Sequence, residues 1–337
     1  MSTAPACLSH SRDTITPALR AAVDRLDHRS RHQAAYHFGW ITADGAPTSA
    51  DAGKAVRPAL ALLSAEAVGA PPEVALPGAV AVELVHNFSL VHDDLMDGDE
   101  ERRHRRTVWK LWGPSSAILT GDAMLVLAQE VLLDTGLPTA APAARLLART
   151  TRHLIRGQVQ DLAFEQRSQV TVGECVDMAA GKTGALLSAS AAIGAVLAGA
   201  PEATVAGLSL YGDQVGLAFQ LVDDVLGIWG DPAVTGKSVH SDLRSRKKSL
   251  PVSHALNQDG PLSGELAAWL DTPGEPAEEE LRRVADLVEN AGGRDWALAE
   301  AARRMALAED ALRGVELDAG ARGELLALGK FVVDRQV

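Results

Sequence analysis

The chain has 337 residues, of which 47% are hydrophobic and only 4% aromatic, and its formal net charge is −12 at pH 7. The hydrophobic fraction is ample for a buried core and excludes wholesale disorder. The acidic balance argues against a nucleic-acid partner, because that function needs clustered lysine and arginine. Alanine and leucine are abundant where aromatic residues are scarce, which favours helices over strands.

The N-terminal residues MSTAPACLSHSRD lack a basic start followed by an apolar stretch, so no secretory signal is predicted, and residues 1–15 are a candidate disordered segment. Cys7 and Cys175 form no CxxC motif and no disulfide framework, which indicates a reduced, cytoplasmic protein. The segment Gly184–Ala200 is as long as the shortest membrane spans, but it is rich in small residues and stops at Pro201. We therefore expect a tightly packed internal helix there and no integral membrane segment.

Apolar residues recur at three- and four-residue spacing along nearly every long segment, which predicts helices. Glycine and proline clusters interrupt this pattern at Thr42–Gly53, Gly69–Gly78, Asp134–Pro142, Asn257–Gly264 and Asp271–Ala277. Three glutamates at 278–280 begin a late helix on the side that its dipole prefers, and Gly292 and Gly293 end it. No internal repeat or dividing linker is present. The sequence thus predicts one all-α helical-bundle domain over residues 1–337.

A first acidic cluster follows an apolar helical segment, in ELVHNFSLVHDDLMDGDEERRHRRTVW from Glu83 to Trp109. On a helix, Asp93 and Asp97 lie one turn apart on one face, with Asp94 beside them. Such carboxylates repel one another, and a hard cation relieves this repulsion; carboxylate oxygens are the ligands that Mg²⁺ prefers. Arginines follow closely, so a salt-bridged acidic helix end is the alternative for this cluster taken alone.

A second cluster lies in Gly216–Pro251, where Asp223 and Asp224 stand in another apolar helical stretch with Gln220 one turn earlier. A polar loop with basic residues follows: Lys237, Arg244, Arg246, Lys247 and Lys248. Two paired-aspartate helices, each followed by cations, indicate that carboxylates hold magnesium, magnesium holds a diphosphate, and lysine and arginine neutralise the remaining phosphate oxygens.

These two regions resemble the aspartate-rich motifs of the polyprenyl synthetase family, the trans-isoprenyl diphosphate synthases. The first, Asp93-Asp94-Leu95-Met96-Asp97, matches DDxxD, and other motifs follow in the family's order from about residue 50 to 255. The resemblance implies the helical isoprenoid synthase fold with a central cavity, a homodimer and three magnesium ions. Asp93, Asp97 and Asp223 would bind the metal, with Asp224 in support.

The resemblance also assigns catalytic and substrate-binding roles. Catalytic residues would be the aspartates Asp93, Asp94, Asp97 and Asp223 together with Lys182 and Lys237. The allylic diphosphate would be bound by Arg102, Lys182, Thr183, Gln220 and Lys237, and isopentenyl diphosphate by Lys54, Arg57, His86 and Arg103. Gln158 and Asp161 match a further cavity-lining position. His86 outside this motif would read as an ordinary half-buried histidine.

Two other site types are rejected on the sequence. Gly181-Lys182-Thr183 resembles the end of a nucleotide phosphate loop, but Val176 stands where that loop needs glycine and no strand precedes it. The histidines and cysteines His28, His32, His37, Cys7 and Cys175 show no metal-ligand spacing.

The chain departs from the family pattern at four places. Gly227 stands where the second motif usually has its third aspartate, and Asp231 is too far on to replace it. Arg106 stands where proline is common, His240 replaces a small residue, and Ala52 replaces the first of two glycines. Because Asp223 remains, we expect metal binding to be kept; the added bulk near the phosphates bears on substrate preference and activity.

The implied reaction is ionisation of dimethylallyl, geranyl or farnesyl diphosphate, followed by attack of the isopentenyl double bond on the allylic cation. Phe88 and Ser89, about one turn before Asp93, would form the floor that limits chain length. A bulky Phe88 with an uninserted DDxxD resembles the pattern for geranylgeranyl diphosphate, with farnesyl diphosphate second. A class I terpene cyclase is a rival, but its NSE-type motif is missing. A catalytically silent partner subunit of a synthase is the other rival, raised by Gly227, Arg106 and His240.

Overall fold

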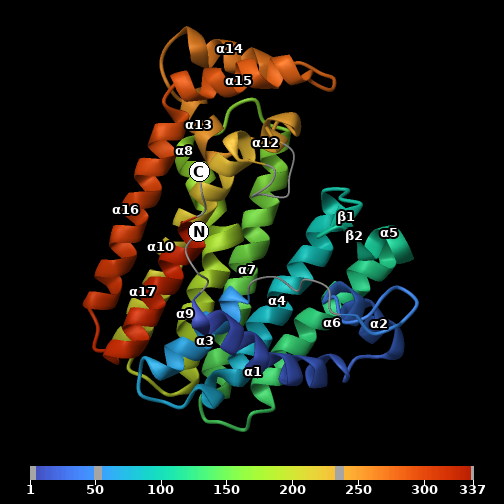
Figure 1. Ribbon diagram of the computed structural model, residues 1–337, viewed down its shortest axis with the longest axis vertical. Helices are drawn as coiled ribbons and strands as arrows, with labels where there is room; N and C mark the ends of the chain where they lie inside the picture. Colours follow the sequence, from blue (N-terminus) through green and yellow to red (C-terminus); the bar gives the residue numbers. More distant parts are fainter. Residues whose placement is uncertain (1–4, 49–54, 232–238, 335–337) are drawn as a thin grey trace. The chain divides into compact units, whose positions relative to one another are not determined.

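The computed structural model describes residues 5–48, 55–231 and 239–334, and almost all of its regular structure is helical (Figure 1). The predicted all-α class is confirmed. The chain divides into two compact units: unit 1 comprises residues 1–151, 189–209 and 315–327, and unit 2 comprises residues 152–188, 210–314 and 328–337. The single domain expected from the sequence stays a prediction.

Unit 1 contains the first acidic cluster. Its elements are α1 (Ala6–Val23), α2 (His28–His37), α3 (Val56–Glu66), the 3₁₀ turn η1 (Pro72–Ala75), α4 (Leu76–Met96), β1 (Glu101–Arg102), β2 (Arg105–Arg106), α5 (Val108–Trp112) and α6 (Pro114–Leu133). Helix α1 begins at Ala6, so the described part of the segment expected to be disordered is helical. The short antiparallel hairpin β1–β2 was not predicted.

Among the described residues, four helices belong partly to each unit: α7 (Ala140–Glu165), α9 (Ala185–Leu197), α10 (Glu202–Trp229) and α17 (Ala319–Val333). Unit 2 also contains α8 (Val172–Ala179), the π-helical turn η2 (Ala180–Gly184), α12 (Ser241–Arg244), α13 (Leu250–Leu256), α14 (Pro261–Leu270), α15 (Glu278–Asn290) and α16 (Gly293–Arg313). Helix α15 begins at the three glutamates and ends at Asn290, just before Gly292, as predicted; α16 begins at Gly293.

Helix α9 is the packed internal helix predicted for Gly184–Ala200. Ala191, Ala192 and Ile193 have no exposed surface. A Cβ atom placed on Gly194 would lie 2.1 Å from the carbonyl oxygen of Ala61 in α3. The small residues of this stretch therefore allow close helix packing in unit 1.

Three stretches are long and apolar enough to cross a membrane by length and composition alone: Pro72–Met96, Pro114–Leu133 and Val172–Leu197. The structure buries 67% of the apolar window in the first and third, but only 39% of the window in the second, which is α6. Helix α6 therefore leaves a large apolar surface uncovered, and the absence of a membrane segment stays a prediction.

The last turns of α4 are fixed by α6, which lies beside it in Figure 1. A Cβ atom placed on Gly121 of α6 would lie 2.2 Å from Nε2 of His92, so only glycine leaves room for that imidazole. The same Nε2 lies 3.0 Å from the Ile118 carbonyl oxygen, and the His92 ring packs edge-on against Phe88 with ring centres 5.4 Å apart. This packing positions the helix end that carries the first aspartates.

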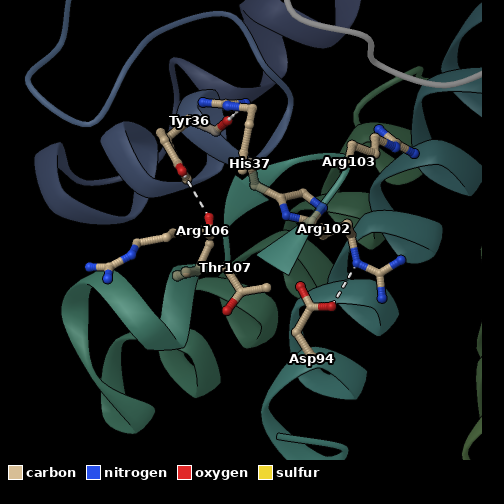
Figure 2. Close-up of a pocket in the computed structure, with 9 residues that line it drawn as sticks. Tyr36, His37, Asp94, Arg102, Arg103, Arg106 and Thr107 are labelled. Atoms are coloured by element: carbon tan, nitrogen blue, oxygen red, sulfur yellow. Dashed lines mark hydrogen bonds and ion pairs between the residues drawn. The ribbon is translucent and has the colours of Figure 1, made fainter. Parts of the chain in front are cut away.

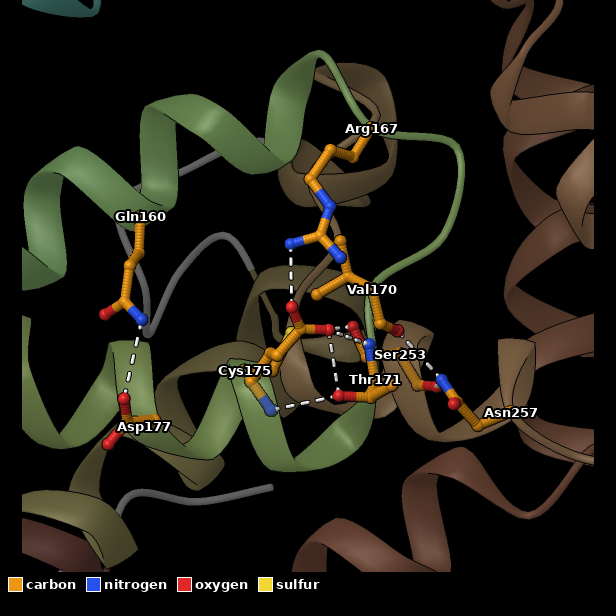
Figure 3. A network of polar contacts seen from close by, with 9 residues as sticks. Gln160, Arg167, Val170, Thr171, Cys175, Asp177, Ser253 and Asn257 are labelled. Atoms are coloured by element: carbon orange, nitrogen blue, oxygen red, sulfur yellow. Dashed lines mark hydrogen bonds and ion pairs between the residues drawn. The ribbon is translucent and has the colours of Figure 1, made fainter.

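The N-terminus of α8 is anchored by the polar network in Figure 3. Thr171 accepts a hydrogen bond from the Glu174 backbone at 3.2 Å, and Glu174 accepts one from the Thr171 backbone at 2.9 Å, forming a capping box. Arg167 donates to Glu174 at 2.7 Å, which lowers the pKa of that carboxyl to about 2. Asn257, the C-cap residue of α13, donates to the Val170 carbonyl at 2.9 Å. These contacts fix the helix that leads into η2.

Candidate active site

The first acidic cluster sits at the C-terminal end of α4. Asp93 is half-buried, Asp94 is only 1% exposed, and Asp97 is exposed at the C-cap. The Asp97 backbone N–H donates to the Asp93 carbonyl at 2.8 Å, so the two residues keep the one-turn spacing expected from the sequence. The cluster thus presents carboxylates at three levels of exposure from one helix end.

Asp94 is paired with Arg102 of the hairpin (Figure 2). The Arg102 Nε–H donates to Asp94 Oδ1 at 2.6 Å, whereas the buried Oδ2 has no hydrogen-bond partner among the described residues. Burial raises the pKa of Asp94 to about 6, against the opposing effect of Arg102. The adjacent cavity of about 20 Å³ has room for roughly one water molecule. A cation, or a water molecule bound to it, could therefore interact with the buried Oδ2 of Asp94.

The hairpin that carries Arg102 is a two-residue turn. Glu101 pairs with Arg106 and Arg102 with Arg105, so Arg103 and His104 form the tip. Both tip residues have positive φ, 52° and 59°, as a type I′ turn requires. Asparagine and glycine favour this conformation, so arginine and histidine hold it at a cost in backbone energy. The turn leaves Arg103 exposed.

Arg105 attaches the hairpin to α2 rather than facing the aspartates. Its two terminal nitrogens donate to the carbonyls of Tyr36 at 2.8 Å and Ile41 at 2.9 Å, and its guanidinium lies 4.1 Å from the Tyr36 ring centre. The Tyr36 hydroxyl donates to the Arg106 carbonyl at 2.8 Å. In Figure 2 the Arg106 side chain extends away from Asp94, so its bulk does not lie over the acidic cluster.

A polar cluster of half-buried side chains around the buried Asn87 lies on the side of α4 that carries His86. Asn87 donates to the Glu83 carboxylate at 2.9 Å and its Oδ1 lies 3.1 Å from His37 Nε2. Burial, then the Arg57 charge, lowers the pKa of His86 well below its ordinary value, so this imidazole is neutral at pH 7. Burial also raises the pKa of Glu83, which Arg57 opposes. The cluster thus contains the half-buried cation Arg57, whose charge is partly compensated by Glu83.

The floor residues predicted for chain length lie on the same helix. Phe88 is 4% exposed and packs against His92, and Ser89 is 8% exposed and donates to the His86 carbonyl at 2.8 Å. Two predicted cations, Lys54 and Lys237, lie outside the described residues.

In unit 2, Lys182 and Thr183 lie on the π-helical turn η2. The Lys182 ammonium donates to Asp161 of α7 at 2.5 Å. A Cβ atom placed on Gly157 would lie 2.3 Å from the Lys182 backbone nitrogen, so the two helices meet backbone to backbone. Gln158, also of α7, is buried with both amide atoms unpartnered among the described residues. Single π-turns are frequent at functional sites because they redirect side chains from a helix.

The second acidic cluster is fixed by a chain of hydrogen bonds. Thr183 donates to Gln220 at 2.7 Å, Gln220 donates to Asp224 Oδ1 at 2.7 Å, and the Leu250 N–H donates to Asp224 Oδ2 at 2.9 Å. Burial raises the pKa of Asp224, which is 4% exposed. Asp223, the predicted metal ligand, is half-buried on the same helix.

Sequence reasoning did not predict two charge interactions of these clusters. The charge of Arg57 acts on Glu83, and the charge of Asp224 acts on Lys247, which the sequence placed only in the basic loop. Burial lowers the pKa of Lys247, but the surrounding carboxylates raise it above its ordinary value. The sequence indicated these interactions only through position, because Glu83 lies one turn before Asn87 on an apolar helix and Lys247 lies in the basic loop.

The close contact at Gly157 gives a stability prediction. Gly157→Ala should lower the free energy of unfolding by about 1–3 kcal/mol, because the methyl group forces the α7 and η2 backbones apart. Urea unfolding measures this effect. Gly173→Ala is the matched control: nothing lies within 4 Å of its Cβ, and alanine there should be neutral or stabilising by up to about 1 kcal/mol. Equal effects of the two variants would contradict the close-contact interpretation.

No three acidic, histidine or cysteine side chains in the described ranges are already gathered as a metal site. Mg²⁺ is commonly held by one or two carboxylates together with substrate phosphates, rather than by a cage of protein ligands alone. Within the first cluster, the half-buried Asp93, the exposed Asp97 and the unused oxygen of Asp94 fit that kind of coordination, and within the second cluster the half-buried Asp223 does.

Comparisons with known proteins agree with this chemistry. The family profile described as polyprenyl synthetase matches residues 41–288. The chain is 53% identical over 332 residues to a (2E,6E)-farnesyl diphosphate synthase of Mycobacterium tuberculosis, covering 98% of this chain and 92% of that protein. It is 42% identical to a geranylgeranyl diphosphate synthase of the same organism, covering 98% and 94%. The crystal structure of a polyprenyl synthetase from Streptomyces coelicolor A3(2) superposes with a TM-score of 0.94 at 55% identity, covering 97% of this chain and 99% of that one.

Proposed function

The chain belongs to the polyprenyl synthetase family, and from this premise we propose that it is a magnesium-dependent trans-prenyltransferase that joins isopentenyl diphosphate to dimethylallyl, geranyl and farnesyl diphosphates. The observation that carries the proposal is the pair of aspartate clusters, each on a helix and each with a basic partner: Arg102 at Asp94 and Lys247 at Asp224. A terpene cyclase needs no isopentenyl site, whereas Arg57, His86 and Arg103 supply one by resemblance.

Magnesium would be held by Asp93, Asp97 and Asp223, three ions in all by family resemblance. When bound, the metal supplies electrostatic stabilisation of the departing pyrophosphate. Asp94 contributes by holding Arg102 at 2.6 Å, which orients the guanidinium for the allylic diphosphate.

The remaining residues bind and orient the substrates. Lys182 and Thr183 contact the allylic diphosphate from η2, where Asp161 and Gln220 hold their side chains. Arg57, Arg103 and neutral His86 bind isopentenyl diphosphate, with Lys54 of the undescribed segment. The double bond then attacks C1 of the allylic cation, and a proton leaves to the pyrophosphate. The apolar interior of the helices excludes water that would quench the cation.

A product assay tests the function. The purified protein receives Mg²⁺, isopentenyl diphosphate and one allylic diphosphate at a time, and mass spectrometry reads intact diphosphates and hydrocarbons. Longer linear diphosphates that disappear with EDTA are expected. Cyclic hydrocarbon formed without consumption of isopentenyl diphosphate would identify a cyclase, and no turnover would identify a silent subunit.

The proposed product is geranylgeranyl diphosphate, with Phe88 as the floor of the cavity for the growing chain. Farnesyl diphosphate is the second candidate, favoured by the 53% identity to a protein named as a farnesyl diphosphate synthase.

Phe88→Ala tests the floor. Removing the ring opens space beneath Asp93, so products should become longer by at least one isoprene unit. Phe38→Ala is the matched control, because Phe38 is also 4% exposed in unit 1 and its loss costs a comparable stability, about 3–5 kcal/mol. The assay is chain-length analysis by mass spectrometry at a temperature where both variants are folded. An unchanged product distribution in Phe88→Ala removes Phe88 from this role.

We also propose a homodimer, with α6 at its interface. Leu119, Val126 and Leu133 recur every seven residues on α6 and are 64%, 59% and 53% exposed. A second copy of the chain would cover this face, because large exposed apolar patches on soluble proteins commonly mark interfaces. Val126→Glu should yield monomers by sedimentation velocity, whereas Ser115→Glu on the same helix should not. A dimeric Val126→Glu protein would exclude this face. The cytoplasmic location stays a prediction.

A further inference from the structure

A second cavity of unit 1 is lined by the C-terminal end of α1, by α2 and by residues 40 and 41. Its volume is about 260 Å³, far larger than the cavity beside Asp94 that has room for roughly one water molecule. Two arginines line it, Arg20 of α1 and Arg31 of α2. No residue assigned above to metal, diphosphate or chain length is among its lining residues. The cavity is therefore a site of its own.

The side chain of Arg20 is held by an aromatic ring and not by an acid. Its guanidinium lies 4.6 Å from the ring centre of Trp40, and Trp40 is itself stacked on the buried Phe38 with ring centres 4.6 Å apart. In the part of the chain that the structure describes, the Arg20 side chain makes no hydrogen bond or ion pair. Because stacking uses the face of a guanidinium, its N–H groups stay available for an acceptor in the cavity.

The charges of the lining favour an anion. Arg31 is half-buried, and its side chain also has no acceptor among the described residues. Asp24 is the one acid of the lining; it is exposed and forms no ion pair with a described residue. Two guanidiniums against one carboxylate leave an excess of positive charge, in a chain whose net charge is −12. Such a local excess attracts a negatively charged small molecule.

Part of the lining is apolar. Val23 is 1% exposed, and Ala35 and Ile41 are half-buried. The His32 ring adds no free donor at Nε2, because this nitrogen donates to the Ala43 carbonyl at 3.0 Å. An inorganic phosphate alone would leave much of the volume to water and would not contact this apolar wall. Cations beside an apolar wall suit an anion that carries a short hydrocarbon group.

We propose that this cavity binds a small organic phosphate. Arg20 and Arg31 hold its phosphate group, since guanidinium groups bind phosphate through paired, charge-assisted hydrogen bonds. Its short apolar group packs against the wall that includes Val23 and Ile41. The inference goes beyond the proposed function and does not depend on it, because no residue of the two acidic clusters lines the cavity.

Arginine footprinting of the full chain tests the site locally. Phenylglyoxal modifies accessible guanidiniums, and mass spectrometry measures the modification rate of each arginine. The probe is isopentyl phosphate, in EDTA to exclude metal-bridged binding, and the concentration that halves the rate measures the local affinity. Arg20 and Arg31 should be protected over the same concentration range. Arg29, which is exposed on α2 and does not line the cavity, is the internal control and should stay unprotected.

Two further probes separate the phosphate from the apolar group. Inorganic phosphate should need a concentration about tenfold higher, because burial of about two CH₂ groups corresponds to that factor. Isopentanol has no charge and should protect neither arginine at the concentrations used for isopentyl phosphate. Equal protection by inorganic phosphate would mean that the apolar wall takes no part, and protection by isopentanol would mean that the arginines do not hold the phosphate. Either result overturns the proposal.

Charge variants test whether the two arginines share one ligand. Arg31→Gln should raise the half-protection concentration at Arg20 by about tenfold or more, whereas the matched variant Arg29→Gln should leave it unchanged. Asp24→Asn removes the opposing charge and should lower that concentration by about 2–5-fold. Circular dichroism checks that each variant is folded.

Three results would show that the cavity is not such a site. The first is a wild-type protein in which isopentyl phosphate fails to protect Arg20 and Arg31. The second is protection of Arg29 equal to theirs, which would indicate general attraction of the anion to surface arginines. The third is an Arg31→Gln protein in which Arg20 is protected at the wild-type concentration.

Discussion

Replacing Asp97 by asparagine is expected to lower kcat by about 100–1,000-fold while changing the free energy of unfolding by less than about 0.5 kcal/mol. Asp97 is exposed at the C-cap of α4, and its backbone hydrogen bond to Asp93 does not involve the carboxylate. The substitution therefore removes one negative charge from the proposed metal-diphosphate site and leaves the packing of α4 intact.

Asp99→Asn is the matched control for this substitution. Asp99 is exposed two residues further along, and it contacts Thr107 and Trp109 through its backbone carbonyl rather than its carboxylate. It should keep wild-type kcat in the linear-diphosphate assay. A similar loss of activity in both variants would mean that the general negative charge of this loop matters, and that Asp97 has no special role.

The acidic clusters were predictable because each places neighbouring aspartates within an apolar helical segment, where carboxylates are rare. Asp93 and Asp97 occur at one-turn spacing in an apolar helix, and Asp223 and Asp224 repeat the arrangement. The occurrence of two such clusters indicates a metal-diphosphate site far more strongly than one cluster would. Helix boundaries near glycine and proline were predictable for the same reason: backbone preference is a local property.

Partners of buried charges were not predictable, because tertiary packing decides them. Nothing in the local sequence indicates that Arg105 binds two carbonyls near α2 while its neighbour Arg102 turns to Asp94. The hairpin itself escaped prediction because its type I′ tip is Arg103-His104 in place of asparagine and glycine. In these positions the surrounding structure overrides the local preference.

The surroundings of Gly227 could not be predicted from the motif in which it stands. The sequence shows that the third aspartate of the motif is missing. It does not show that Asp242, fifteen residues further on, lies within 2.5 Å of the position of the missing Cβ atom. Spacing along a helix identifies side chains that share that helix, whereas a side chain of a later helix, such as Asp242 of α12, is recognised as a neighbour only in three dimensions.

His37, the half-buried histidine of α2 that contacts Asn87, leads to the second large effect. Between pH 7 and pH 5 the wild-type free energy of unfolding should fall by about 2 kcal/mol more than that of His37→Gln. Burial, followed by the charges of Arg102, Arg103 and Arg105, lowers the pKa of His37 to about 3. In the unfolded chain the imidazole titrates near 6.5, so below that pH only the unfolded state takes up the proton, and stability is lost progressively as the pH falls towards 3.

Glutamine at position 37 keeps a hydrogen-bond donor for Asn87 but has no titrating group, so it removes this pH-dependent contribution. Asp94 and Asp224, whose pKa values are raised, act with the opposite sign between pH 4 and 6, yet they are present in both proteins and cancel in the difference. Urea unfolding at the two pH values measures the difference, and His28→Gln, exposed on the same helix α2, is the control that should follow the wild type. Parallel pH profiles for wild type and His37→Gln would mean that His37 accepts its proton in the folded protein, and that the neighbouring arginines and the buried surroundings do not keep it neutral.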